Sequence, residues 1–289
     1  MTCKILMMIP VWRRPEILKL FVRNLTRVIP DYCEVIPFFI LSQTDPELRQ
    51  NEQATEGYMS TFADNKPLGE KKNTGLSQAL ELDWDYYMDM GSDDIFTCRL
   101  WELLEDCIEC REVYFGLRNL HVFEIYSGRA KYVPGYHINK LDKVAPIGPG
   151  RCIRRDVVEN FFPLWPAINQ GLDSSSDLKL QEAGIEPVLI DSDEAVMCDV
   201  KTNVHLWPYE FFDDMGEDIS GEWVREAFDI KQDYKAPFDA FHTSVLKQSN
   251  LPRSEGFKRC NEWHEITTGA PRYSSYGSYR VQVTRKNKK

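Results

Sequence analysis

The stretch DYYMDMGSDDIFT, residues 85–97, joins an apolar segment to an abrupt polar stop. Tyr86–Met90 is rich in aromatic and apolar residues, which is typical of a buried strand. A glycine and a serine end this segment, and Asp93 and Asp94 follow side by side. Adjacent carboxylates repel each other unless cations or hydrogen-bond donors face them. This strand end is therefore the first candidate for a functional site.

Apolar segments on both sides of this stretch alternate with segments of helical spacing. We predict strands at residues 4–10, 35–42, 58–62 and 86–90, and helices from Pro15, at 69–82 and at 98–110. Further along we predict two strands within 112–133 that turn at Ser127-Gly128, a helix at 155–161, a helix from Gly171 capped by Asp173 or a nearby serine, and more strand within 187–204. The alternation predicts an α/β fold with a mostly parallel, Rossmann-like sheet flanked by helices.

Ligands of such sheets bind beyond the carboxyl ends of the strands. Polar stretches fall at three of these ends, namely residues 10–14, 42–45 and 91–94. The pattern predicts one domain at residues 1–206 and a less regular C-terminal extension at residues 207–289. Ligand-binding residues are expected in the first of these.

Composition narrows the class of protein. The 289 residues are 43% hydrophobic and 28% charged, which is ordinary for a soluble globular protein. The early apolar run Ile5–Ile9 is too short for a membrane helix and is not followed by a cleavage site. We therefore expect a cytoplasmic protein without a membrane span. The net charge is −10, and an acidic body argues against a broad nucleic-acid surface.

The eight cysteines are scattered along the chain. One Cys-x-x-Cys pair occurs, at Cys107 and Cys110, inside a helical pattern. A structural zinc site needs four ligands, and no second pair is present. Reduced, packed thiols are the better interpretation.

The chain lacks the two common glycine-rich phosphate loops. A dinucleotide-binding turn requires Gly-x-Gly-x-x-Gly, and a P-loop requires Gly-x-x-x-x-Gly-Lys-Ser/Thr. The turn after the first strand instead reads PVWRRP and contains no glycine. Paired carboxylates suit Mg²⁺ or Mn²⁺, which can bridge phosphates. A metal-assisted phosphate site is therefore the remaining possibility.

Five stretches of the sequence are informative together, namely ILMMIPVWRRPEIL, FFILSQTDPE, NKPLGEKKNTGLSQALELDWDYYMDMGSDDI, GPGRCIRRDVVE and DSSSDLKLQEAG. In their order and spacing they resemble the family 2 glycosyltransferases and their GT-A fold over about residues 4–205. The resemblance implies a metal-dependent, inverting transfer of a sugar from a nucleotide-diphosphate sugar, such as a UDP-sugar, to an acceptor hydroxyl. The signature of processive synthases, Gln-x-x-Arg-Trp, is missing, so the resemblance is to the non-processive type.

Two departures from the family pattern concern acidic residues. The metal motif of the family is Asp-x-Asp, whereas Gly91 stands at its first position here. Asp93, with Asp94, would then hold the metal. The family usually carries a Glu-Asp pair before the helix that is predicted here from Gly171. That pair is not clearly present, which leaves Asp173 and Asp177 as candidates for the general base.

The resemblance also implies positions for the donor. The donor-binding positions are Pro10, Val11, Arg13, Asp45, Lys72, Asn73 and Ser92, with Pro10, Val11 and Asp45 around the base and ribose and Lys72, or its neighbour Lys71, near the phosphates. His205 would complete the metal shell.

Each of these assignments has a structural alternative. Asp93 and Asp94 could cap the following helix, and Asp173 could cap its own helix, because acidic side chains are favoured at helix N-termini. His205 could be an ordinary half-buried histidine. Lys72 and its neighbour could lie on a solvated helix face.

The C-terminal tail interleaves tyrosines with basic residues. The sequence PRYSSYGSYRVQVTRKNKK carries aromatic and cationic groups of the kind that bind single-stranded nucleic acid. A transferase that modifies DNA bases would use such an arm, and the simpler interpretation is a solubilising end. The sequence does not identify the acceptor, and the candidates are a hydroxyl on a glycan, on a small molecule or on a modified DNA base.

Two other functions remain open on this sequence. A nucleotidyltransferase of similar fold would use the same metal but attack the α-phosphate, and it usually carries a basic, glycine-rich opening loop that is missing here. A non-catalytic sugar-binding module would explain the lost first aspartate of the metal motif.

Overall fold

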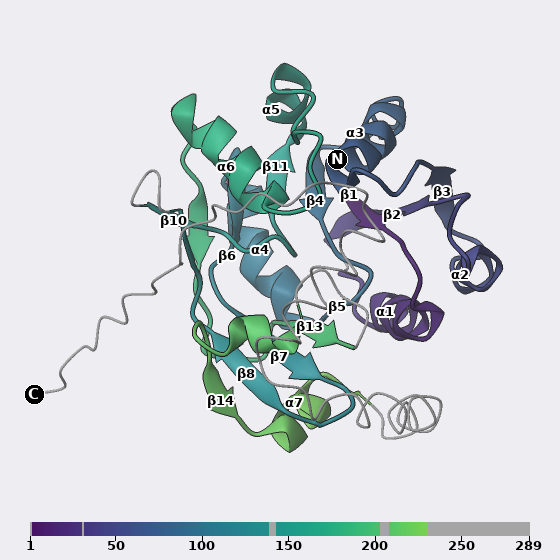
Figure 1. The fold of residues 1–289 in the computed structure, drawn as a ribbon. Helices are drawn as coiled ribbons and strands as arrows, with labels where there is room; N and C mark the ends of the chain where they lie inside the picture. Colours follow the sequence, from purple (N-terminus) through teal and green to yellow (C-terminus); the bar gives the residue numbers. More distant parts are fainter. Residues whose placement is uncertain (1, 31, 139–142, 203–207, 231–289) are drawn as a thin grey trace, which may run out of the picture.

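Strand β1 (Cys3–Pro10) is an inner strand of a seven-stranded sheet, and its residues from Ile5 to Ile9 are apolar and buried. The computed structural model describes residues 2–30, 32–138, 143–202 and 208–230. Within these ranges the chain forms an α/β structure with a large sheet, a smaller five-stranded sheet and flanking helices (Figure 1). The predicted fold class, a Rossmann-like mixed sheet flanked by helices, is confirmed.

The large sheet has the strand order β12-β6-β11-β4-β1-β2-β3. Its other strands are β2 (Cys33–Leu41), β3 (Met59–Phe62), β4 (Tyr86–Asp89), β6 (Tyr114–Leu117), β11 (Cys152–Arg154) and β12 (Val188–Ile190). Strand β11 runs antiparallel to both of its neighbours, whereas the other pairs are parallel. The carboxyl ends of β1, β2 and β4 therefore lie at one edge.

Alternate residues of β1 face opposite layers of the core. Ile5, Met7 and Ile9 belong to one cluster of buried side chains, and Leu6 and Met8 belong to the other. A strand buried on both faces reads as a continuous apolar run, which is why KILMMIP predicts it so clearly.

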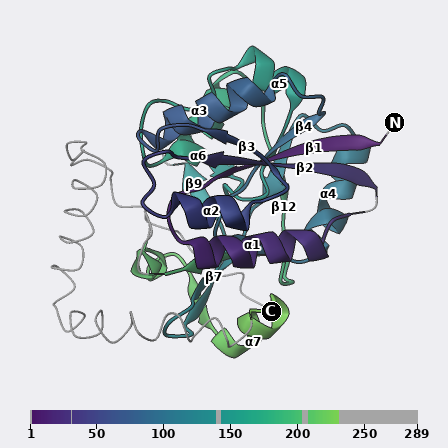
Figure 2. The ribbon, with the colours of Figure 1, turned by 90° about the vertical axis from the view of Figure 1, so that its right-hand side faces the viewer.

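Helices cover both faces of the large sheet. The α-helices are α1 (Pro15–Arg27), α2 (Leu48–Ala54), α3 (Leu68–Ala79), α4 (Arg99–Glu109), α5 (Arg155–Asn160), α6 (Leu172–Glu182) and α7 (Gly221–Ala227). Figure 2 shows α1 on one side of the sheet and α3 and α5 on the other. The apolar faces of α1 and α4 share the cluster of Met7, and those of α3, α5 and α6 share the cluster of Leu6.

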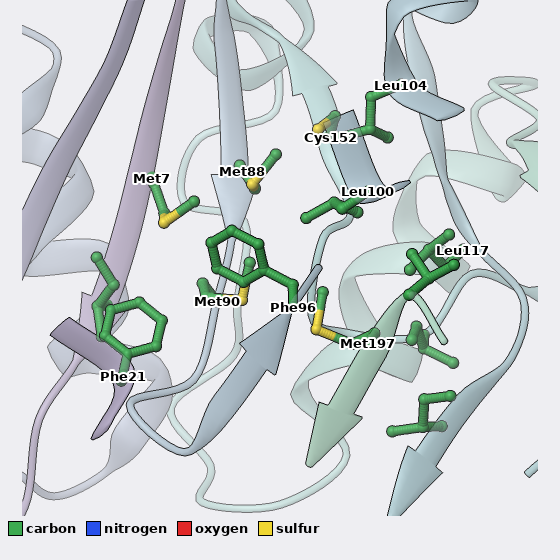
Figure 3. Close-up of a cluster of buried hydrophobic side chains, with 14 of the residues drawn as sticks. Met7, Phe21, Met88, Met90, Phe96, Leu100, Leu104, Leu117, Cys152 and Met197 are labelled. Atoms are coloured by element: carbon green, nitrogen blue, oxygen red, sulfur yellow. The ribbon is translucent and has the colours of Figure 1, made fainter. Parts of the chain in front are cut away.

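The smaller sheet has the order β14-β8-β7-β13-β5. Its strands are β5 (Asp94–Phe96), β7 (Leu120–Glu124), β8 (Ala130–Val133), β13 (Met197–Lys201) and β14 (Glu217–Ile219). Phe96 and Met197 of this sheet pack with Met7 and Met88 of the large sheet in one buried cluster (Figure 3). The shared core fixes the position of Asp93 and Asp94 at the junction of the two sheets.

Two predicted strand regions proved to be more divided than expected. Residues 112–133 hold β6, β7 and β8, of which only β7 and β8 turn at Ser127-Gly128. Residues 187–204 hold β12 and β13, which belong to different sheets. An apolar run gives no sign of a change of sheet, because each sheet buries its strands against the same core.

Residues 208–230 contain the 3₁₀ helix η1 (Tyr209–Phe212), β14 and α7, with β14 paired to β8. The short strands β9 (Tyr136–Ile138) and β10 (Lys143–Ala145) form a separate pair. The division of the chain at residue 206 stays a prediction.

Two other expectations concern membranes and cysteines. None of the helices in the described ranges is both long and apolar enough to span a bilayer. The seven cysteines within these ranges are free thiols, and burial raises the pKa of Cys107 to about 11.

Candidate functional site

The ends of three strands are tied together by Lys71. This α3 side chain is 1% exposed. Its Nζ donates to the main-chain oxygen of Val11 (2.5 Å), to Ser42 Oγ (3.0 Å) and to Asn65 Oδ1 (3.1 Å). Burial lowers the pKa of Lys71 to about 7, although nearby Asp45 acts in the opposite direction. Lys71 therefore holds the loops after β1, β2 and β3 at one edge.

The loop after β1 is strained and is held by two acidic side chains. Arg13 and Arg14 have φ angles of 57° and 58°, which non-glycine residues rarely adopt. The Arg13 N–H donates to Asp45 Oδ2 (2.7 Å), and the Arg14 N–H donates to Glu47 Oε2 (2.9 Å). Backbone strain in non-glycine residues is found most often at functional sites, where the surrounding structure fixes the loop.

Asp45 is nearly buried, with 6% of its surface exposed. Besides Arg13, it accepts hydrogen bonds from the Glu47 N–H (2.9 Å) and from Asn51 Nδ2 (2.9 Å). Asp45 thus joins the loops after β1 and β2. Its expected contact with the base or ribose stays a prediction. Val11 is fully buried beside it, and Pro10 is half-buried.

The side chain of Arg13 has no carboxylate partner within the described ranges. Its guanidinium lies 5.6 Å from the centre of the Trp12 ring, and its buried Nε has no hydrogen-bond partner there. Burial lowers the pKa of Lys66, and the positive charge of Arg13 acts in the same direction. Two cations therefore lie close together at this edge, which is an arrangement that an anion stabilises.

Asp93 and Asp94 lie at the start of β5 and do not cap a helix. The residue before α4 is Cys98, and neither aspartate bonds to that helix end. Asp94 Oδ2 accepts a hydrogen bond from the Gly91 N–H at 2.6 Å. Asp199 of β13 is the residue paired with Asp94 on the neighbouring strand. Burial, with the charges of Asp93 and Asp199, raises the pKa of Asp94 well above its usual value. The alternative that the pair caps the following helix is wrong.

Asp93 faces the loop after β1. Its Oδ2 accepts a hydrogen bond from Arg14 Nη1 at 2.7 Å, and Arg14 Nη2 lies 3.4 Å from Ser92 Oγ. Ser92 is 3% exposed. The structure thus brings together Arg14, Ser92 and Asp93 from the ends of two neighbouring strands.

Gly91 leaves room for the carboxylates of Asp93 and Asp94. A Cβ atom at this position would lie 2.5 Å from Asp94 Oδ2 and 2.8 Å from Asp93 Oδ1. Any side chain there would displace the two carboxylates. Glycine therefore allows Asp93 and Asp94 to occupy this corner together.

The described ranges contain no group of three His, Cys, Asp or Glu side chains that could hold a metal ion. Asp93 and Asp94 are the two carboxylates that directly follow β4 at this edge. A magnesium ion that takes its other ligands from substrate phosphates and water needs only one or two protein carboxylates. The pair therefore fits a cation that arrives with a diphosphate and does not fit a cation held by the protein alone. His205, the third expected ligand, lies outside the described residues.

Lys72 and Asn73 face the interior. Lys72 Nζ bonds to both carboxylate oxygens of Asp89 (2.7 and 2.6 Å) and lies 4.3 Å from the centre of the Trp165 ring. Asn73 donates from Nδ2 to the main-chain oxygen of Trp165 at 2.7 Å. The structure does not bring these two side chains to Asp93. The alternative of a solvated face is wrong for Lys72, which is 4% exposed.

The two candidate bases differ sharply in exposure. The Asp173 side chain is 49% exposed in the first turn of α6, whereas Asp177 is 0% exposed. Asp177 Oδ1 accepts the Tyr114 hydroxyl at 2.5 Å, and its Oδ2 accepts Gln181 Nε2 at 3.2 Å. Burial raises the pKa of Asp177 despite these donors. An acceptor from solution could reach Asp173 but not Asp177.

Asp173 does not cap its helix. The cap residue of α6 is Gly171, with a φ of 68°, and no side-chain cap hydrogen bond is made at this helix start. The expectation of an aspartate or serine cap is wrong, because the chain enters α6 through a glycine in the left-handed region.

Two further charged residues of this region were missed from the sequence. Asp89 and Arg151 are 4% and 0% exposed and lie 3.2 Å apart between Oδ2 and Nη2. An aspartate among the apolar residues of a buried strand signals a buried partner. The sequence does not show which of the cations supplies it.

The comparisons with known proteins concern the fold. No family model matches the chain, and no curated protein matches it. Among solved structures it is similar to S. aureus TarS 1–349 in complex with UDP-GlcNAc, with 13% identity and a TM-score of 0.49 over 73% of this chain and 64% of that one. The chain thus spans less than two thirds of the length of that protein.

Two shorter proteins are similar over 90% of their own chains. A CMP:2-keto-3-deoxy-manno-octonic acid synthetase complexed with CTP shares 16% identity with a TM-score of 0.43 over 65% of this chain. A 4-diphosphocytidyl-2C-methyl-D-erythritol synthase shares 13% identity with a TM-score of 0.45 over 66% of this chain. With TM-scores below 0.5 and identities of 16% or less, these likenesses carry no argument about the activity or the family of this chain.

Proposed function

We propose that this protein is a glycosyltransferase that moves a sugar from a nucleotide-diphosphate sugar to an acceptor hydroxyl, with a UDP-sugar as donor. The observation that carries the proposal is the convergence of charges at the edge where β1, β2 and β4 end. Arg13 and Arg14 supply positive charge, Asp93 supplies a carboxylate, and Asp173 supplies a second, half-exposed carboxylate.

The cations suit the diphosphate of the donor. Arginine binds phosphate oxygens through paired N–H groups, and Arg13 has no carboxylate partner within the described ranges. Arg14 is paired with Asp93 in the protein alone, so that a bound diphosphate would draw Arg14 away from that carboxylate. Both arginines lie on the loop that Asp45 and Lys71 hold in place.

The acidic pair suits a divalent cation. Asp93, with Asp94, would hold Mg²⁺ or Mn²⁺ against the diphosphate. Such a cation supplies Lewis-acid stabilisation of the departing nucleoside diphosphate.

Asp173 is the general base of the proposed reaction. It accepts the proton of the acceptor hydroxyl while that oxygen bonds to the anomeric carbon. The bond from the anomeric carbon to the diphosphate oxygen breaks in the same displacement, and the nucleoside diphosphate leaves with its electron pair. A single displacement inverts the anomeric centre.

The test uses water as the acceptor. The purified protein is incubated with Mn²⁺ and a panel of UDP-, GDP- and dTDP-sugars, and the release of the nucleoside diphosphate is measured. A nucleoside diphosphate released from one of them supports the proposal. Pyrophosphate released from a nucleoside triphosphate and a sugar phosphate would instead support a nucleotidyltransferase. Absence of turnover together with saturable sugar binding would support a non-catalytic module.

A further inference from the structure

Arg151 is a completely buried cation next to the proposed base. It immediately precedes β11 and has no exposed surface. Its Nη1 donates to the main-chain oxygen of Asp173 at 3.0 Å, and its Nη2 lies 3.6 Å from Asp173 Oδ1. One rigid guanidinium thus contacts both the main chain and the carboxylate of Asp173.

A residue of β4, Asp89, also holds the guanidinium of Arg151. Its Nη2 donates to Asp89 Oδ2 at 3.2 Å, and Asp89 also binds Lys72 through both oxygens. The main chain is fixed too, because the Asp89 N–H donates to the Arg151 oxygen at 2.9 Å and the Gly150 N–H donates to the Asp89 oxygen at 2.8 Å. Lys72, Asp89 and Arg151 therefore form a buried network of charges that ends at the half-exposed Asp173.

The backbone of Gly148 lies against the Asp173 carboxylate. A Cβ atom at Gly148 would lie 2.5 Å from Asp173 Oδ2 and 3.0 Å from its Oδ1. The carboxylate thus lies against the glycine on one side and faces Arg151 on another. The remaining side is open to solvent.

We propose that Arg151 is a positioning residue that fixes the orientation of the Asp173 carboxylate for proton transfer. This inference rests on the proposed function, because it assigns the base of that reaction. A free aspartate side chain turns among several rotamers, and a misplacement of about 1 Å can cost roughly 100-fold in rate. Lysine could replace the charge of Arg151, but it cannot contact the main-chain oxygen, the carboxylate and Asp89 with one planar fork.

Four variants test the inference through donor hydrolysis. They are Arg151→Lys, Asp173→Asn, the double variant and the control Arg155→Lys. Arg155 is a suitable control because it also donates to main-chain oxygens, those of Leu80 and Leu82, but contacts no residue of the site. We expect Arg151→Lys to lower kcat by about 10- to 100-fold with the donor KM unchanged. The control should keep the wild-type kcat.

The double variant separates positioning from a merely structural role. If Arg151 acts through Asp173, Arg151→Lys has no further effect on kcat in the Asp173→Asn background. Independent, multiplied losses in the double variant would overturn the inference while leaving the transferase activity of the wild type in place. A wild type that hydrolyses no sugar nucleotide would overturn the proposed function instead.

A crystal structure decides the positioning without any turnover. In Arg151→Lys we expect the Asp173 carboxylate to leave its place against Gly148, with the Lys72–Asp89 pair unchanged. Gly148→Ala is a second variant, which should displace the same carboxylate by contact without removing a buried charge. An Asp173 carboxylate that keeps its wild-type position in Arg151→Lys overturns the inference.

Discussion

The guanidinium of Arg14 and the carboxylate of Asp93 join two strand ends across 2.7 Å. Arg14 belongs to the strained loop after β1, and Asp93 lies between β4 and β5. Their side chains are only 18% and 16% exposed, so that each partly neutralises the other away from bulk water. In the proposed donor complex, the diphosphate would pair with Arg14 and its cation would pair with Asp93, in exchange for this internal pair.

Asp93→Asn tests the carboxylate of this pair. The substitution removes a charge without a change of shape, and we expect the release of nucleoside diphosphate to fall at least about 100-fold in the presence of Mn²⁺. The unfolding midpoint should stay close to that of the wild type, because Asn still accepts a hydrogen bond from Arg14. Asp83→Asn, which changes an 86% exposed carboxylate away from the site, is the control. Wild-type turnover in Asp93→Asn would remove Asp93 from the metal site.

Asp173→Asn and Asp177→Asn are expected to fail in different ways. Asp173→Asn should lower the rate of transfer by about 10²- to 10⁴-fold and leave donor affinity intact, which is typical of the loss of a general base. Asp177→Asn should leave the proposed base Asp173 in place but lower the free energy of unfolding, because Asp177 is buried and bonded to Tyr114 and Gln181. Three measurements on both variants distinguish a catalytic from a structural role: turnover, donor binding by calorimetry and the free energy of unfolding. Lost donor affinity in Asp173→Asn would make this residue a donor contact.

Lys72→Met separates a structural role from phosphate binding. Removal of one partner of a buried ion pair typically costs about 3–5 kcal/mol, and Arg151 compensates part of that loss at Asp89. We expect the free energy of unfolding in urea to fall by about 3 kcal/mol. If stability stayed unchanged while donor affinity fell, Lys72 would be the phosphate ligand expected from the sequence.

His121→Phe tests a pH effect that lies outside the site. His121 is 4% exposed among the rings of Tyr132, Trp223 and Phe228, and burial lowers its pKa. The unfolded chain therefore takes up a proton at a higher pH than the folded protein does, and stability is lost as the pH falls below about 6.5. We expect the wild type to lose more unfolding free energy than His121→Phe between pH 7.5 and pH 5.5. Equal losses in both proteins would show that this histidine titrates normally.

The strands of the large sheet could be predicted because they are buried on both faces. KILMMIP and VIPFFILS read as continuous apolar runs, and the observed β1 and β2 agree with them within two residues. The same pattern predicts the location of the candidate site, since the carboxyl ends of parallel strands meet at one edge. Arg13, Arg14, Asp45, Ser92 and Asp93 do lie at that edge.

The pairing of buried charges could not be predicted. Lys71 and Lys72 are adjacent, yet one holds three loops and the other neutralises Asp89. Helical spacing places both on α3 but does not say which acceptors the sheet presents to each. Similarly, Asp173 and Asp177 are one turn apart on α6, and only the packing of Tyr114 shows which of them is buried. Such partners come from long-range contacts that local patterns do not contain.

The most direct test of the account is calorimetry of UDP binding with Mn²⁺ to the wild type and to Asp93→Asn. We expect a saturable heat in the wild type that is lost when EDTA replaces the metal and is strongly weakened in Asp93→Asn. Absence of heat with UDP, GDP and dTDP alike, in the presence of Mn²⁺ and for a folded wild type, would contradict a nucleotide-sugar site at the end of β4.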